Sequence, residues 1–374
     1  MTDFEGDIEV PDSYALAGSI SIRGWADIVI SINKLPLDNI QSATFTRNMN
    51  IGSGTCSIKL SDPDRTNYQI FHAQDEIEIF VLASKDPYIG RKAWGGFVDE
   101  CTFDISDGMT LTITGKDYIS RLQTQICSYA PVATPLGTAL RTVMANQVDF
   151  SYEGIPVFAE NVQPNFTNDT LYNAIKQMCD QWLVYFWIDP ITRDMSARKS
   201  SVLVASPETL IEGPVGGYAQ PVPILRGSKI KNNSETLSNT VIVYGNTVTG
   251  TYTDPISESA HGVFSRALTV GTIATGAQAN DYAQTLVEAK GNPLDSFEIE
   301  SQMLVYTDPG DYIQIVCDSL GLSGFYQVLD LSHSWSNTTG LKSKITTNNL
   351  LVLPRTYIAD MERRLQTVEK QAFA

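Results

Sequence analysis

Trp94-Gly-Gly-Phe-Val-Asp-Glu-Cys-Thr-Phe103 is followed shortly by Leu111-Thr-Ile-Thr-Gly-Lys-Asp-Tyr-Ile-Ser-Arg-Leu122. In the first stretch and at the start of the second, apolar and polar side chains alternate, which is typical of β-strands with one buried face. After Gly115 the apolar residues lie three and four positions apart, which indicates a helix. The two stretches therefore predict two strands that lead into a helix.

The same alternation continues toward the N-terminus and makes the first 115 residues a β region. Turn residues such as Asp62-Pro-Asp64 separate the strands. The strands are expected at 20–22, 28–32, 42–46, 55–60, 76–82, 96–103 and 109–114. Short strands at regular spacing favour a barrel or a sandwich.

Toward the C-terminus, residues 116–205 read as a small inserted α+β domain. Helical spacing is found at 116–123, 135–145 and 170–182, and apolar strand 184–188 precedes a polar strand that ends at Lys199. Residues 206–228 follow with four prolines, so we expect a connector without a core element there.

A second β region is expected at 229–350, with a clear strand at 239–245, a helix at 277–289 and strands resuming at Ser296, Asp311 and Phe325. Asp75-Glu-Ile-Glu-Ile and Asp311-Tyr-Ile-Gln-Ile are similar, and each is followed by a Gly-aromatic strand, at Gly96 and at Gly324. The order is shared but few residues are identical. An internal duplication and a chance likeness of two antiparallel hairpins both remain open.

The C-terminal segment 351–374 has the spacing of an amphipathic helix. Its apolar residues Ile358, Met361, Leu365 and Val368 lie three and four positions apart, as at the a and d positions of a coiled coil. These four residues are the candidate oligomer contacts. Two heptads also suit a helix that packs on its own or on a neighbouring subunit.

The charge balance excludes a surface dedicated to phosphate binding. The 374 residues include 26 Lys and Arg against 42 Asp and Glu, a formal charge of −16, whereas nucleic-acid binders use basic surfaces. The N-terminus is acidic, so we expect no signal peptide. The longest strongly apolar run, 183–188, is far shorter than the ~20 residues that span a bilayer.

The residues that usually carry chemistry show no motif. The five cysteines lack a C-x-x-C pair, which favours buried reduced thiols. His72, His261 and His333 lie in no metal-binding or nucleophile motif, and we expect them to be structural or on the surface. No P-loop is present. We expect no catalytic residue, no cofactor and no bound metal.

Two clusters have a functional and a structural interpretation. The carboxylates of Asp99, Glu100, Asp104 and Asp107 could bind a hard cation, but they lack EF-hand spacing and are more typical of a solvated strand edge. The aromatic residues at 182–187 could form a binding platform, but their place on a helix end and a strand favours the core.

The quoted stretches resemble the baseplate hub proteins of tailed phages, the late control protein D family. That family has a Gly-aromatic-Val strand, a second strand, and then a basic residue with Asp-Tyr opening a helix. Further matches lie at 170–175, 237–245 and 309–315, at Gly324-Phe-Tyr-Gln-Val, and at His333. The order and spacing agree over residues 40–350.

The resemblance implies a structural, non-enzymatic virion protein that assembles in the host cytoplasm. Each chain would contain two tube-protein-like β-barrel domains, 1–115 and 229–350, and a homotrimer would form a pseudo-hexameric ring. Its partners would be the tail tube protein or distal tail ring, the spike or tip protein and the tape measure protein. DNA would pass only transiently through the lumen during ejection, and we expect acidic residues of both domains to line that channel.

Two other functions remain as alternatives. A receptor- or carbohydrate-binding tail protein would place its ligand on the aromatic residues at 182–187 or on the connector. A cell-wall hydrolase would hide its site in residues 120–205, although no nucleophile, metal or acid/base motif is recognisable there.

Overall fold

The computed structural model describes residues 8–9, 27–49, 52–82 and 89–348, the last range with short gaps. The gaps are at 107, 131–132, 146–148, 159, 163–165, 181, 183, 200–201, 203, 214–220, 226, 234–236, 246, 271–272, 274, 292–293 and 303. The described residues are β-rich, with one mixed sheet of 15 strands, four small sheets and several helices. The β-rich α+β class expected from the sequence is therefore present.

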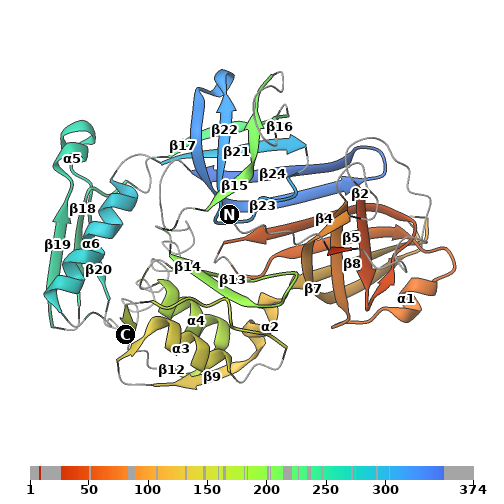
Figure 1. Ribbon diagram of the computed structural model, residues 1–374, viewed down its shortest axis with the longest axis horizontal. Helices are drawn as coiled ribbons and strands as arrows, with labels where there is room; N and C mark the ends of the chain where they lie inside the picture. Colours follow the sequence, from red (N-terminus) through yellow and green to blue (C-terminus); the bar gives the residue numbers. More distant parts are fainter. Residues whose placement is uncertain are drawn as a thin grey trace.

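Residues 27–117 form the first half of the large sheet, drawn in red and orange on the right of Figure 1. Its elements are β2 (Asp27–Ile32), β3 (Leu35–Pro36), β4 (Ile40–Asn48), β5 (Thr55–Ser61), α1 (Thr66–Ile70), β6 (Glu76–Leu82), β7 (Ile89–Asp104) and β8 (Thr110–Asp117). The neighbour order is β4-β5-β8-β7-β6-β2-β3, and β1 (Ile8–Glu9) pairs with β7. Alternate residues, including Ile58, Ile79 and Ile113, are fully buried in one core.

Residues 205–233 and 294–348 form the second half, at the top of Figure 1. Its elements are β15 (Ala205–Ile211), β16 (Pro221–Pro223), β17 (Lys229–Asn233), β21 (Leu294–Gln302), β22 (Tyr312–Cys317), the 3-10 helix η2 (Asp318–Leu320), β23 (Leu322–Ser336) and β24 (Gly340–Asn348). The neighbour order is β17-β21-β24-β23-β22-β15-β16. The path turns back on itself, because the Leu225 amide donates to the Glu300 carbonyl at 2.7 Å. This half encloses a separate core that includes Ile299, Ile313 and Ile345.

The segment 206–228 differs from the expected connector, because it contains β15 and β16. Leu210 is fully buried in the second core, and β15 pairs in parallel with both β16 and β22. The prolines are accommodated because Pro207 lies where the β15–β22 register shifts, and Pro221 and Pro223 lie on the last strand of the path. Proline frequency therefore did not distinguish an edge strand from a loop.

Residues 118–199 form the inserted α+β unit at the bottom of Figure 1. It contains α2 (Ile119–Thr124), β9 (Ile126–Tyr129), β10 (Thr134–Pro135), α3 (Leu136–Met144), β11 (Asn161–Val162), β12 (Phe166–Thr170), α4 (Leu171–Asp180), β13 (Val184–Ile188) and β14 (Met195–Lys199). The helices and the two strands expected here are present, with small shifts at their ends. α2 begins later than expected because β8 continues to Asp117, whose carboxylate then accepts the Ile119 amide at 3.1 Å.

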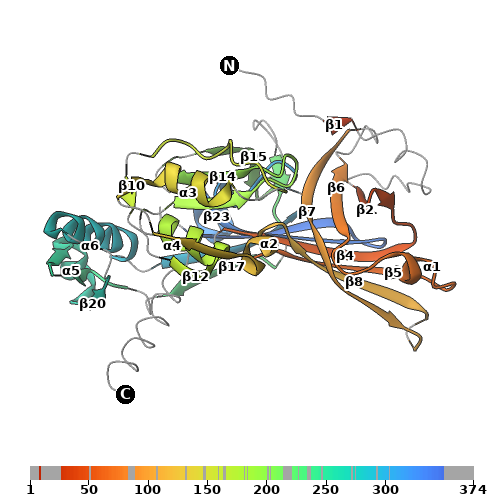
Figure 2. The ribbon, with the colours of Figure 1, turned by 90° about the horizontal axis from the view of Figure 1, so that it is seen from below.

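Residues 237–291 form a second separate unit, where the sequence indicated part of the second β region. It contains β18 (Thr240–Tyr244), β19 (Thr249–Thr253), α5 (Pro255–His261), β20 (Ser265–Thr269) and α6 (Gly276–Lys290). The expected strand and helix exist, but the three strands pair only with one another, and they share a small core with α6. Figures 1 and 2 both show this unit at one end of the molecule. A strand pattern predicts a strand but not the sheet to which it belongs.

Some predictions lie outside the described residues. The C-terminal helix with Ile358, Met361, Leu365 and Val368 is one of them, and the strand at 20–22 is another. In the part of the chain that the structure describes, no helix has the length and apolar character needed to cross a membrane.

The two halves of the large sheet repeat one pattern of pairing. β4-β5-β8-β7-β6 in the first half and β17-β21-β24-β23-β22 in the second half have the same order, and both runs are antiparallel throughout. β7 and β23 are also the two longest strands, with 16 and 15 residues.

Candidate functional site

The two halves meet edge to edge where β4 pairs with β23, a contact that we call the seam. The seam is an antiparallel ladder in which residues 42–48 of β4 face residues 336–330 of β23. Phe45 lies opposite His333, both are almost fully buried, and their ring centroids are 4.7 Å apart. The seam thus joins two cores through one continuous ladder of backbone hydrogen bonds.

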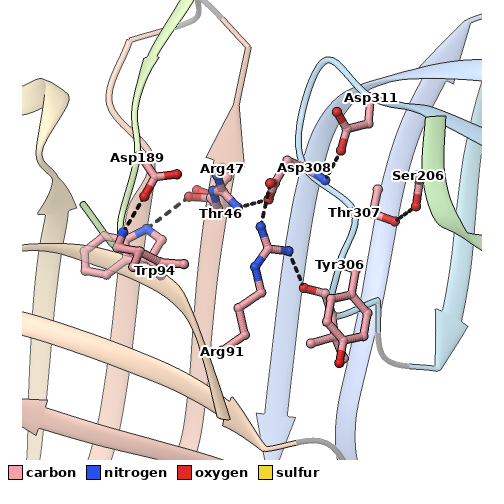
Figure 3. Close-up of polar contacts among 12 residues, drawn as sticks. Thr46, Arg47, Arg91, Trp94, Asp189, Ser206, Tyr306, Thr307, Asp308 and Asp311 are labelled. Atoms are coloured by element: carbon pink, nitrogen blue, oxygen red, sulfur yellow. Dashed lines mark hydrogen bonds and ion pairs between the residues drawn. The ribbon is translucent and has the colours of Figure 1, made fainter. Parts of the chain in front are cut away.

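A small ionic cluster closes one end of the seam (Figure 3). The Asp308 carboxylate accepts hydrogen bonds from Arg47 of β4 and, at 2.6 Å, from Arg91 of β7. Arg91 also donates to the Val305 carbonyl at 2.7 Å. Burial alone would raise the pKa of Asp308, but the two guanidinium groups hold it below its ordinary value. One carboxylate from the second half therefore binds two strands of the first half.

The loop that carries Asp308 is held from the other side by Glu208 of β15. The Glu208 carboxylate accepts the Val305 amide at 2.7 Å, the Tyr306 amide at 3.2 Å and the Thr307 hydroxyl at 2.6 Å. Burial raises the pKa of Glu208 even though these three donors oppose the shift. The strand in the supposed connector thus supports the loop of the ionic cluster.

His333 lies in the middle of the seam and is buried as an apolar residue would be. Its Nδ1 lies 2.9 Å from the Ser343 hydroxyl of β24, and only 2% of its surface is exposed. Burial lowers the pKa of His333 to about 3, with a further contribution from the positive charge of Arg47. The imidazole is therefore neutral at physiological pH, which agrees with the structural role expected for it.

The inserted α+β unit contacts both halves beside the seam. Arg193 pairs with Glu76 of β6 in the first half. Toward the second half, the Gln327 amide donates to the Tyr185 hydroxyl at 2.8 Å, and Arg198 lies 3.3 Å from Asp311. The inserted α+β unit thus contacts both halves of the large sheet, and these contacts restrict the angle between the two halves.

The other residues singled out in the sequence lie away from the seam or in the cores. Tyr185 and Phe186 are buried, as the core interpretation predicted, whereas Trp182 and Trp187 are only half-buried. The carboxylate of Asp99 pairs with Lys116 at 2.9 Å on the surface, and Asp104 accepts the Ser106 amide at 2.8 Å. Asp107 lies outside the described residues. Among those described, no three His, Cys, Asp or Glu side chains converge as metal ligands would.

Nothing in the local sequence pattern singles out Arg47, Arg91 or Asp308. The turn Pro309-Gly310-Asp311 was noted as a motif, and Asp308 directly precedes it. Nothing in the sequence indicates, however, that Arg47 and Arg91 lie beside a residue more than 200 positions away. Only the pairing of β4 with β23 brings these side chains together.

Several solved structures have a fold similar to this one. No protein-family model matches the chain, and no curated protein matches it in sequence. A tail protein from Neisseria meningitidis MC58 matches in structure with a TM-score of 0.65 and 12% identity over 87% of this chain and 96% of that one. The 43 kDa tail protein of prophage MuSo2 from Shewanella oneidensis matches with a TM-score of 0.67 and 12% identity over 86% and 98%.

Prophage tail protein gp18 from Listeria monocytogenes EGD-e matches with a TM-score of 0.61 and 17% identity over 92% of this chain and 99% of that one. The chain has the fold of a phage tail protein. At these identities the likeness concerns the fold, and it extends over nearly the whole length of each tail protein.

Proposed function

We propose that this protein is a structural baseplate hub of a tailed phage, with no catalytic activity. In this proposal a homotrimer forms a pseudo-hexameric ring that joins the hexameric tail tube to the threefold spike or tip and surrounds the DNA channel. The carrying observation is the repeat of one antiparallel strand order in the two halves, joined edge to edge at the seam. Further support is the tail-protein fold.

Symmetry explains why a hub needs such a repeat. Three identical chains offer six similar surfaces to a hexamer only if each chain contributes two. In the proposal each half of the large sheet acts as one tube-like β-barrel module, with its own core. The seam and its ionic cluster fix the angle between the two modules of one chain.

The repeated strands also define one continuous face for the channel wall. The strands β7-β8-β5-β4-β23-β24-β21-β17 are neighbours in this order, and their residues alternate between the cores and the opposite face. The charged register positions of that opposite face are acidic at Glu100, Asp104, Glu298, Glu300 and Asp330, and basic at Lys59, Lys116, Lys229, Lys342 and Lys344. The expected acidic wall is not supported, because this face carries both signs in similar number.

The proposed partners follow from the ring. The tail tube protein or distal tail ring would bind the pseudo-hexameric face, the spike or tip protein the threefold face, and the tape measure protein the lumen. One neighbour, the E. coli c3393 protein, is described as a component of the type VI secretion system with structural similarity to the T4 tail proteins gp27 and gp5, and it matches this chain with a TM-score of 0.53. The candidate contacts Ile358, Met361, Leu365 and Val368 would add to the trimer.

The mass of the purified full chain tests the proposal. Native mass spectrometry should give three times the 41.1 kDa chain mass, and electron microscopy should show rings that cap hexamers of the tail tube protein encoded beside it. A protein that stays monomeric at micromolar concentration and does not bind tube hexamers would contradict the hub. Retention of such a monomer on a glycan array would favour the receptor-binding alternative.

A further inference from the structure

Within one chain the repeat forms a single seam, between β4 and β23. The strands that correspond to them, β17 and β7, lie at the two ends of the eight-strand run. We propose that the β7 edge from Glu100 to Asp104 pairs antiparallel with β17 of a second copy of this chain, in the register that β23 and β4 adopt within one chain. This inference rests on the proposed ring and specifies the contact between its chains.

β7 and β23 are equivalent down to single backbone bonds. In β7 the register with β8 shifts between Val98 and Glu100, and in β23 the register with β24 shifts between Val328 and Asp330. At the first bulge Val98 exchanges two hydrogen bonds of 2.8 Å, donating to the Asp75 carbonyl and accepting the Gln74 amide.

At the second bulge Val328 does the same with Asp311, at 2.9 Å, and Gly310, at 2.7 Å. Asp75 and Asp311 open the two similar motifs seen in the sequence, and their carboxylates accept equivalent amides, from His72 at 2.7 Å and Asp308 at 2.9 Å. The β-bulge thus marks the same position in both strands, so Glu100 corresponds to Asp330 and Phe103 to His333. These bonds favour duplication over chance likeness, although Gly96 corresponds to Tyr326 and not to Gly324.

β4 and β17 are equivalent through their neighbours. Ile58 of β5 faces Ile113 of β8, and Ile299 of β21 faces Ile345 of β24, so the two isoleucines of β5 and β21 correspond. Phe45 of β4 pairs with Cys56, two residues before Ile58. By the same count the residue of β17 that corresponds to Phe45 is Ile230, which pairs with Phe297.

The two long strands differ in what covers them. β23 is covered by β4 along residues 330–336, and its core-facing Leu331 and His333 are only 1% and 2% exposed. On β7, β6 ends its pairing at Phe97, and no other described strand takes its place beside residues 100–104. The corresponding core-facing residues, Cys101 and Phe103, are only half-buried. A strand laid on this edge would complete their burial.

The composition of β17 fits that edge. Carrying over the seam register places Ile230 opposite Phe103 and Lys229 opposite Asp104, with Asn232 opposite Cys101. The opposite charges of Lys229 and Asp104 would then lie side by side, and both residues are exposed. Among the described strands, β17 pairs only with β21. Cross-strand pairs of this kind stabilise a sheet by about 0.2–1 kcal/mol each.

Only a second copy of this chain satisfies both edges at once. The eight-strand run begins at β7 and ends at β17, so each added chain continues the sheet with the same face toward the same side. In a closed ring this contact alternates with the internal seam, and both edges that could otherwise recruit foreign strands are covered.

A single cysteine substitution tests the register. In Asn232→Cys the new thiol would face the native Cys101 of the neighbouring chain, and directly opposite strand residues have the spacing that a disulfide needs. We expect oxidation with diamide to produce covalent dimers and trimers on non-reducing gels. The control Asn233→Cys, one position along and on the opposite side of the strand, should give no such product, and Cys101→Ser should abolish the product of Asn232→Cys.

A charge exchange tests the surface without a new bond. Lys229→Glu with Lys231→Glu should raise the concentration at which the oligomer dissociates at least tenfold, and adding Glu100→Lys and Asp104→Lys should restore it. Circular dichroism and the melting temperature check that each variant folds. Trimers that form without the cross-link and ignore the charge reversal would overturn this inference but leave the hub standing. A chain that forms no oligomer at all would overturn both.

Discussion

At the scale of single residues, the seam combines a half-buried carboxylate, that of Asp308, with a buried imidazole, that of His333. Asp308 is held ionised by Arg47 and Arg91, whereas His333, at the centre of the same ladder, is held neutral. Both effects arise from one environment, because the guanidinium of Arg47 favours a negative carboxylate and disfavours a positive imidazole. The seam is therefore sensitive to pH through individual residues.

His333→Phe should flatten one part of the pH profile of stability. The unfolded chain protonates this imidazole near its ordinary pKa of 6.5, but the folded protein does so only near pH 3. Above pH 6.5 His333 therefore does not reduce the free energy of unfolding. As the pH falls from 6.5 toward 3, His333 lowers that free energy by up to about 1.4 kcal/mol per pH unit. Phe is the residue at the equivalent position 103, so it should fit. Urea midpoints between acid and neutral pH measure the slope.

Asp117→Asn supplies the matched control with the opposite sign. Burial raises the pKa of Asp117 to about 7. Asp117 therefore adds to the free energy of unfolding at pH values below its pKa in the unfolded chain, and this contribution is lost as the pH rises toward 7. This variant should therefore lose stability more steeply on acidification than the native chain. If His333→Phe kept the native slope, the imidazole would not be the neutral buried group described above.

None of these residue-level effects could be predicted from the sequence. The sequence offers His333 only as one match to a family pattern, and its burial arises because β4 covers it. The pairing of Arg47 and Arg91 with Asp308 depends on strands that are distant in sequence. Local patterns carry no information on such contacts.

At the scale of elements, local pattern predicted much more. β6 and β13 have the expected bounds, and α3, α4 and α6 lie where helical spacing indicated them, because alternation and helical spacing follow directly from which face is buried. Failures occurred where burial does not depend on local pattern. β15 was missed because prolines resemble loop residues, and β18 was assigned to the wrong sheet.

Gly96→Ala should destabilise β7. A Cβ at this position would lie 2.1 Å from the Lys116 carbonyl and 2.7 Å from the Asp117 Cα of β8. Since both are backbone atoms, the strands must separate, and we expect a loss of about 2–3 kcal/mol. Gly276→Ala at the start of α6 meets nothing within 4 Å and should be neutral or stabilising by up to about 1 kcal/mol. Equal urea midpoints for the two variants would contradict this account.

At the scale of the whole molecule, the two inserted units differ in their attachment. The α+β unit exchanges hydrogen bonds with both halves through Arg193, Tyr185 and Arg198. The 237–291 unit has its own core and enters and leaves beside a single strand pair, Asn233 with Leu294. The first unit is thus part of the framework, and the second is an addition to one hairpin.

Replacing residues 234–293 by Asn-Gly should leave a folded chain. Asn233 and Leu294 already face each other across β17 and β21, and Asn-Gly forms the two-residue turn that suits such a pair. We expect cooperative melting within a few degrees of the full chain and an unchanged number of chains in the oligomer. Deletion of residues 119–199 is the contrasting variant, and it should prevent folding. If the variant that lacks residues 234–293 aggregated, the 237–291 unit would be needed to support the sheet.

The seam within the chain also determines how assembly depends on dilution. In the proposed ring, half of the edge contacts lie inside a polypeptide, where the effective concentration of one module for the other is fixed by the chain and not by the solution. Ring closure then requires only encounters between whole chains, and dilution releases monomers in which the two modules stay joined. Each monomer carries one β7 edge and one β17 edge, so an incomplete ring is always able to accept the next chain.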